Sequence, residues 1–180
     1  PENQRNLIRN ATKRITDIAN NLLSQHKTQR IAAQYDNISN ECLSECVIEV
    51  ISEKRIQYNT EAINLVEELE KNCHLIYAQI EATRLKRTLS NLIDNAVEAT
   101  QAQGNVTISL SSDDESALIT IQDDGHGIPK EHLHRILQGA YTNKATGSGI
   151  GLSSAIKCIE DFKGKLEINT LANGTTITIS

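Results

Sequence analysis

The sequence predicts an α+β fold, a two-layer α/β sandwich in which helices cover one face of a mixed β-sheet. Segments 106–110 and 117–122 alternate apolar and polar residues with the period of a strand and form a hairpin. Segment 82–100 has the three- and four-residue spacing of an amphipathic helix. With 180 residues, of which 38% are hydrophobic and 23% charged, the chain suits one well-buried domain and an appendage.

The composition argues against nucleic acid as a partner. The formal net charge is −5 and only 3% of residues are aromatic, whereas nucleic-acid-binding proteins usually present a basic face and stacking rings. No run of 18 apolar residues occurs, so we expect no membrane contact by this fragment and a cytoplasmic location. Membrane anchoring through a preceding segment stays open, because a chain that starts at Pro1 and lacks Met resembles an excised piece.

The four cysteines form no metal-binding motif. They are Cys42, Cys46, Cys73 and Cys158, without a C-x-x-C pair, and we expect reduced and mostly buried thiols. Cys42 and Cys46 would share a helix face and could bind a metal together with His74, but a tetrahedral set of ligands is missing. A metal site there is therefore disfavoured.

Residues 1–28 are predicted to form a bundle-type helix. Between Ile8 and Leu22, apolar residues recur at alternating spacings of three and four. The narrow stripe favours a dimerisation or bundle seam, although a helix packed on its own domain stays open. A polar linker, 29–40, leads into the main domain, 41–180.

The main domain alternates predicted helices and strands. In chain order we expect a helix at 41–53, strands at 62–66 and 74–78, the helix 82–100, the hairpin 106–110 with 117–122, a lid at 130–148 containing a short helix at 131–137, a helix from 147 to 162, and strands at 165–170 and 175–180.

The segment from Asp123 to Ile128 is expected to form one wall of a pocket. It follows a predicted strand and carries glycines at 125 and 127, which permit close approach of the backbone to a ligand. Taken alone, Asp-x-Gly-x-Gly is also typical of an ordinary loop.

Asn91 and Asn95 lie four residues apart and would project from one face of the helix 82–100. Asparagine is a poor helix former, so the pair calls for a reason. One explanation is that both asparagine side chains are simply exposed to solvent. The other is that an amide oxygen is a hard ligand suited to Mg²⁺, which takes its remaining ligands from phosphates and water.

Alternating glycines at 147, 149 and 151 precede the helix that ends at 162. Successive N–H groups at a helix start, together with the helix dipole, favour a polyphosphate, and Lys144 adds a positive charge. The pattern is neither a Walker loop nor a dinucleotide fingerprint. A purely structural turn stays open.

In this order, the three stretches resemble the N box and the two glycine boxes of the GHKL ATP-binding superfamily. The catalytic domain of sensor histidine kinases is the most similar group, through Leu89 to Ala99, Asp123 to Pro129, and Thr142 to Leu152. The resemblance covers about residues 41–180 and implies the GHKL fold with ATP and Mg²⁺ as ligands.

The resemblance also implies roles for individual residues. Asp123 would accept a hydrogen bond from the adenine amino group, assisted by Thr175, and Asn95 would bind Mg²⁺. Lys144 would hold the triphosphate. The other nucleotide-binding residues that it implies are Gly125, Gly127, Ile128, Gly147, Gly149, Gly151 and Leu152.

Asn91 stands where the superfamily's ATP hydrolases carry a glutamate. An amide cannot act as a general base at neutral pH, which favours phosphoryl transfer over hydrolysis. Three residues depart from the kinase pattern: Glu98, where a basic residue is common; Leu137, where the lid usually has phenylalanine; and Asp124, where asparagine is common and little effect is expected.

The segment from Arg14 to Leu23 resembles the second helix of a dimerisation and phosphotransfer hairpin, which implies a homodimer. None of the five histidines has the sequence context of a phosphoacceptor, and His126 is the one expected near nucleotide. The expected function is transfer of the ATP γ-phosphoryl to a histidine outside this fragment, for relay to a response regulator. A regulatory nucleotide-binding scaffold and a GHKL serine kinase are the alternatives.

Overall fold

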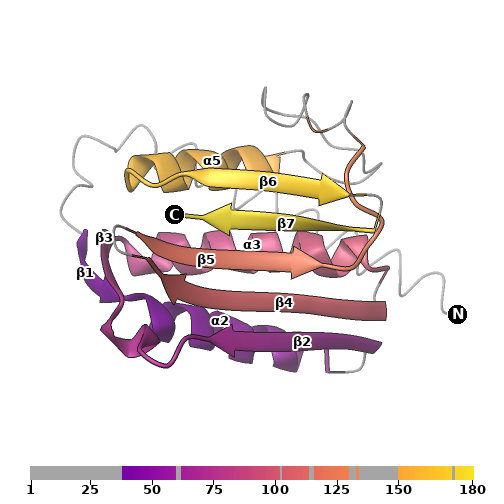
Figure 1. Cartoon of the computed structure of the whole chain (residues 1–180), viewed down its shortest axis with the longest axis horizontal. Coiled ribbons are helices and arrows are strands. Elements are labelled where there is room, and N and C mark those ends of the chain that lie inside the picture. The colour runs from indigo at the N-terminus through magenta and orange to yellow at the C-terminus, as the bar shows by residue number, and fades with distance from the viewer. Residues whose placement is uncertain are drawn as a thin grey trace, which may run out of the picture.

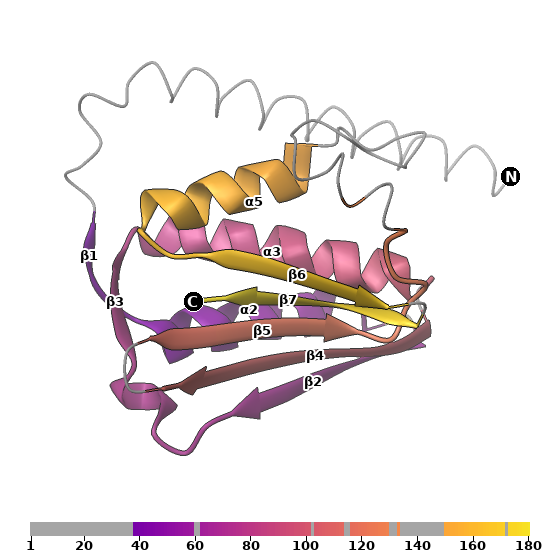
Figure 2. The same ribbon diagram turned by 45° about the horizontal axis from the view of Figure 1, so that its top comes forward.

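The computed structural model describes residues 38–59, 62–101, 103–113, 116–129, 133, 150–171 and 173–180. They form two layers, a five-stranded sheet and a layer of helices on one of its faces (Figures 1 and 2). The expected helix at 1–28 and almost all of the expected lid lie outside the described residues. Within the described residues, no helix is long and apolar enough to cross a membrane.

The elements are labelled as in Figure 1. In chain order they are β1 (Ser39–Cys42), α2 (Leu43–Gln57), β2 (Ala62–Leu69), the 3-10 helix η3 (Cys73–Leu75), β3 (Tyr77–Ile80), α3 (Ala82–Ala99), β4 (Gln103–Ser112), β5 (Ala117–Asp123), α5 (Ile150–Asp161), β6 (Leu166–Leu171) and β7 (Gly174–Ile179).

The main sheet is mixed, as the sequence predicts. Its strand order is β2-β4-β5-β7-β6, with β2 and β4 parallel and the other neighbours antiparallel. The parallel pair needs a crossover connection, and α3 lies in that connection. A separate two-stranded ladder joins β1 to β3.

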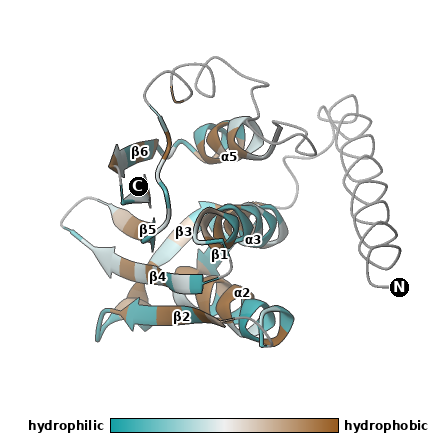
Figure 3. Ribbon diagram, turned by 90° about the vertical axis from the view of Figure 1, so that its right-hand side faces the viewer, coloured by the Kyte–Doolittle hydropathy of each residue, from teal (hydrophilic) through white to brown (hydrophobic). Residues whose placement is uncertain are grey.

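The core lies between the sheet and the helices. Figure 3 shows the sheet on one side and α5, α3 and α2 on the other, with apolar residues between the layers. The apolar stripe of α3 is buried, as its spacing predicts. It packs in one cluster with alternate residues of β4, β5 and β7. The cluster's most buried members include Leu89, Leu92, Ile93, Val106, Ile108, Leu110, Ile119 and Ile121.

Two expectations about the start of the domain are wrong. Glu41 and Cys42 belong to β1 and not to a helix, and Ser39 and Asn40 belong to β1 and not to a linker. The reason is the pairing of β1 with β3, which sets Asn40 opposite Gln79 and holds Cys42 in an extended conformation at the start of α2. Local periodicity does not report a ladder between such distant residues.

The expected strand at 74–78 is also wrong in its first half. Cys73–Leu75 forms the 3-10 helix η3, which contains His74, and β3 starts only at Tyr77. The remaining predicted elements of the described part are confirmed, with shifts of a few residues at their ends.

The four cysteines are free thiols, with Cys46 and Cys158 buried and Cys42 and Cys73 half-buried. Burial raises the pKa of Cys46 and of Cys158, so both stay protonated. In the described part of the chain, no three His, Cys, Asp or Glu side chains are placed to hold a metal ion.

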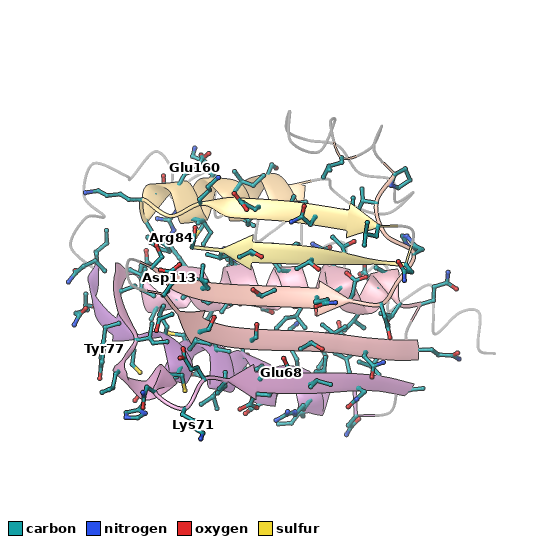
Figure 4. All side chains as sticks on the ribbon, in the orientation of Figure 1. Glu68, Lys71, Tyr77, Arg84, Asp113 and Glu160 are labelled. Carbon is teal, nitrogen blue, oxygen red and sulfur yellow. The ribbon has the colours of Figure 1, made fainter. Side chains whose placement is uncertain are left out.

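Helix α5 is fixed against α3 by Arg84 (labelled in Figure 4). Its Nη2 lies 2.5 Å from Oδ2 of Asp161, and its guanidinium carbon lies 5.2 Å from the ring centre of Phe162. These contacts hold the C-terminal end of α5 on the first turn of α3. The orientation of α5 matters because its other end approaches Asn95.

A buried ion pair joins α2 to α3. Lys54 is 4% exposed, and its Nζ lies 2.6 Å from Oδ1 of Asp94. Tyr58 donates its hydroxyl hydrogen to the same oxygen over 2.5 Å. Replacing Asp94 would leave the buried Lys54 cation without a carboxylate and next to the neutral side chains of Gln57 and Tyr58.

We therefore expect Asp94→Ala to lower the free energy of unfolding by about 3 kcal/mol, the usual cost of breaking a buried pair. Lys54→Met is expected to cost less, since Asp94 is more exposed than Lys54 and keeps its bond from Tyr58. Urea unfolding of both variants measures the difference. Equal losses, or an Asp94→Ala loss of less than about 1 kcal/mol, would contradict an energetically important pair.

Candidate functional site

The buried face of the sheet changes from apolar to polar at one end. The strand register places Asp123, Thr175 and Thr170 side by side on β5, β7 and β6. The two preceding rows on this face contain only apolar residues, Ile121 with Ile177 and Ile168, and Ile119 with Ile179 and Leu166. A polar row on an otherwise apolar buried face requires hydrogen-bond partners. This row is the centre of the candidate site.

Asp123 is 7% exposed and Thr175 5%. Oδ1 of Asp123 accepts hydrogen bonds from the backbone N–H of Gly125 at 2.9 Å and of Thr175 at 3.3 Å. Burial raises the pKa of Asp123, and the two N–H donors only partly offset that effect. Among the described residues, every hydrogen bond to this carboxylate uses Oδ1, so Oδ2 is available to a ligand that donates a hydrogen bond.

The loop after Asp123 is pressed against α3 on one side. A Cβ added to Gly125 would lie 2.5 Å from both the carbonyl carbon and the oxygen of Ala99. The N–H of His126 donates to the same carbonyl oxygen over 3.3 Å. Only glycine fits at position 125 without moving the helix backbone.

The loop then turns against the hairpin formed by β6 and β7. Gly127 has a φ of +67°, and a Cβ there would lie 1.9 Å from the carbonyl oxygen of Leu171. The next N–H, of the half-buried Ile128, donates to Oγ1 of Thr170 over 2.6 Å. Both glycines of the motif thus occupy sites that exclude a side chain.

The same segment is tied to β4 by Asp124. Its two carboxylate oxygens accept hydrogen bonds from Asn105, one from the backbone N–H at 2.9 Å and one from Nδ2 at 2.8 Å. These donors lower the pKa of Asp124. Asp124 thus anchors the loop through both of its oxygens, a contact that its place in the motif does not reveal.

Helix α3 links the loop to the start of α5. Ala99 of α3 contacts the loop, as described above, and Asn95 lies one turn earlier on the helix. A Cβ built on Gly151 would lie 3.8 Å from Nδ2 of Asn95, an ordinary contact distance. The structure therefore brings Asn95 beside the first turn of α5. Asn91 and Glu98 are exposed on α3.

The remaining predicted residues are only partly described. Leu152 is half-buried and packs on the core. Lys144, Gly147, Gly149 and Leu137 lie outside the described residues, as do His132 and His134, and so their predicted roles stay predictions. Sequence reasoning missed Thr170 and Asn105, because neither belongs to a recognisable motif and both enter the site through strand register.

The site combines a buried carboxylate at the end of a mixed sheet, a glycine loop packed on a helix, and an asparagine beside the start of a second helix. This combination defines a class of ATP-binding protein. The family model described as "Histidine kinase-, DNA gyrase B-, and HSP90-like ATPase" matches residues 80–180. The chain belongs to this family.

Its relatives indicate the sensor histidine kinase branch. Sporulation kinase A of Bacillus subtilis is 33% identical over 93% of this chain, and the sensor histidine kinase WalK of the same organism is 27% identical over 88%. The catalytic domain of histidine kinase ThkA superposes with a TM-score of 0.71 and 27% identity, over 79% of this chain and 93% of that domain. The chain has the sequence and the fold of a sensor histidine kinase catalytic domain. It spans 27% and 30% of the length of the two Bacillus proteins.

Proposed function

We propose that this chain is the ATP-binding part of a sensor histidine kinase and that the intact protein transfers the γ-phosphoryl of ATP to a histidine outside this fragment. A response regulator would then accept the phosphoryl group. The observation that carries the proposal is the buried Asp123 carboxylate, which keeps Oδ2 for a ligand at one end of α3 while Asn95 faces the start of α5 nearby.

The two ends of the site would bind the two ends of the nucleotide. Oδ2 of Asp123 suits an exocyclic amino group, which donates hydrogen bonds, and adenine has such a group. The start of α5 suits phosphates, because helix N-terminal N–H groups and the helix dipole attract anions. Lys144 and the amides of Gly147 and Gly149 would add to that end.

The chemistry of Asn95 fits Mg²⁺. Its amide oxygen is a hard ligand, and a magnesium ion held by one protein group expects phosphate oxygens and water for its other ligands. When bound there, the ion would neutralise charge on the transferred phosphoryl group. Asn91, exposed one turn earlier on the same helix, cannot take a proton from water at neutral pH, which would protect ATP from hydrolysis.

The Mg²⁺ assignment predicts a selective effect of Asn95→Ala. Calorimetric titration with ATP is expected to show that Mg²⁺ tightens binding to the wild-type chain and no longer does so in the variant, while Mg²⁺-free binding changes little. Asn91→Ala is the matched control and should keep the Mg²⁺ effect. If Asn95→Ala retains the full effect, another residue holds the ion.

Phosphoryl transfer itself is tested with labelled ATP and an added dimerisation hairpin that contains an acceptor histidine. We expect an acid-labile phosphohistidine. Nucleotide binding without transfer would favour the regulatory scaffold, for which Glu98 supplies a reason, since its exposed carboxylate on α3 would repel phosphate. An acid-stable label on a partner protein would favour a serine kinase.

A further inference from the structure

Thr170 lies at the outer end of the polar row. It is half-buried on β6, an edge strand, and its cross-strand partner on β7 is Thr175, the residue whose N–H donates to Asp123. Cross-strand partners place their side chains on the same face of a sheet. Thr170 therefore extends the row of Asp123 and Thr175 towards the loop that closes over this end of the sheet.

The Thr170 hydroxyl group accepts one hydrogen bond and donates another. Oγ1 accepts a hydrogen bond from the N–H of Ile128 at 2.6 Å, and the hydroxyl donates to the carbonyl oxygen of Gly174 over a longer 3.5 Å. One side chain thus connects the end of the glycine loop to the residue immediately before Thr175. Removing the hydroxyl would leave a half-buried N–H without its partner.

The path of the glycine loop is fixed at three places. Asp124 holds its start on β4, and Ala99 of α3 contacts its middle. At its end, Gly127 has a φ of +67°, and because glycine lacks a Cβ and can adopt many other backbone conformations, this end needs a separate contact to fix it. Two side-chain hydrogen bonds of the described residues involve this end: Nδ1 of His126 lies 2.7 Å from the carbonyl oxygen of Gly127 within the loop itself, and the N–H of Ile128 donates to Thr170, which connects the loop to β6.

We propose that Thr170 is a positioning residue for the nucleotide base. Its hydroxyl holds the backbone of Ile128, and with it Gly127, against β6, and so sets where the loop backbone lies relative to Asp123. Thr170 touches the loop and not the reacting atoms, so its effect is on base affinity. This inference rests on the proposed binding of adenine by Asp123.

The test compares Thr170→Val, which keeps the branched shape and removes the hydroxyl, with Thr170→Ser, which keeps the hydroxyl. Loss of one hydrogen bond predicts that Thr170→Val binds ATP about fivefold more weakly. AMP affinity should fall by the same factor, because AMP and ATP share the base. The amide hydrogen of Ile128 should exchange faster with solvent. Thr170→Ser should restore binding to within about twofold of the wild type.

Thr178→Val is the matched control. Thr178 is half-buried on β7, pairs with Glu167 and Thr120, and lies three residues along the strand from Thr175, so its variant should bind nucleotide like the wild type. Equal affinity of Thr170→Val and wild type would overturn the inference, and so would a Thr170→Ser variant as weak as Thr170→Val, since packing would then be the cause. Asp123→Asn separates failure of the Thr170 inference from failure of the proposed adenine binding. If Asp123→Asn leaves ATP binding unchanged, the adenine assignment fails and the role of Thr170 fails with it.

Discussion

Asp123→Asn is expected to weaken ATP binding at least tenfold, or by about 1.4 kcal/mol or more. The Oδ1 atom faces two N–H donors, from Gly125 and Thr175, so the asparagine carbonyl oxygen would take that place. The amide nitrogen would then replace Oδ2. A hydrogen-bond donor would face the donating amino group of adenine, and the contact would become repulsive.

The same substitution is not expected to destabilise the folded protein. Burial raises the pKa of Asp123 above its ordinary value, so the folded state binds a proton more readily than the unfolded state. The protonated carboxyl group stabilises the folded state relative to the ionised one. This stabilisation is fully present at low pH and is lost as pH rises from the ordinary carboxylate pKa through the raised value. At neutral pH the ionised carboxylate costs folding free energy, and a neutral amide removes that cost.

Calorimetry with ATP and thermal unfolding without nucleotide measure the two effects separately. Asp124→Asn is the control, because its remaining oxygen can still accept from the backbone N–H of Asn105, and the exposed side chain of Asn105 can turn to present its own oxygen to the new amide group. Its ATP affinity should therefore stay within about twofold of the wild type. Unchanged ATP affinity in Asp123→Asn refutes the adenine assignment. A strong loss of stability would show that the carboxylate serves folding.

The sequence predicts those parts of the fold that depend on local periodicity. The stripe of α3 and the alternation of β5 each report a buried face directly, and both elements lie where expected. The ladder between β1 and β3 depends on residues about forty positions apart, and β1 has only four residues, two of them exposed. Such a short element carries no pattern from which its partner could be inferred.

The candidate site likewise contains residues that the sequence predicts and residues that only the strand register reveals. Asp123, Gly125 and Gly127 are recognisable from the sequence, because a glycine spacing after a strand has few physical explanations. Thr170 is not, since a threonine on an edge strand is ordinary. It becomes part of the site only when the register of β7 with β6 sets it beside Thr175.

Gly125→Ala is expected to damage both stability and binding. The added Cβ would lie 2.5 Å from the carbonyl carbon and oxygen of Ala99, well inside contact distance, and neither atom belongs to a side chain that could rotate away. Overpacking of this kind costs about 1–3 kcal/mol. Because Gly125 also donates to Asp123, relief of the clash would pull that hydrogen bond apart. We therefore expect ATP affinity to fall more than tenfold, or by more than about 1.4 kcal/mol.

Gly151→Ala is a matched control with the opposite expectation. Among the described residues, the new methyl group would meet Nδ2 of Asn95 at an ordinary 3.8 Å, and alanine favours a helix by about 1 kcal/mol over glycine. The variant should melt at or above the wild-type temperature and keep its backbone N–H for phosphate. Denaturant unfolding and ATP titration of the two variants distinguish a glycine required by close packing from one required only near the ligand. If Gly125→Ala is as stable as the wild type, the loop can leave α3, and Ala99 does not fix its path.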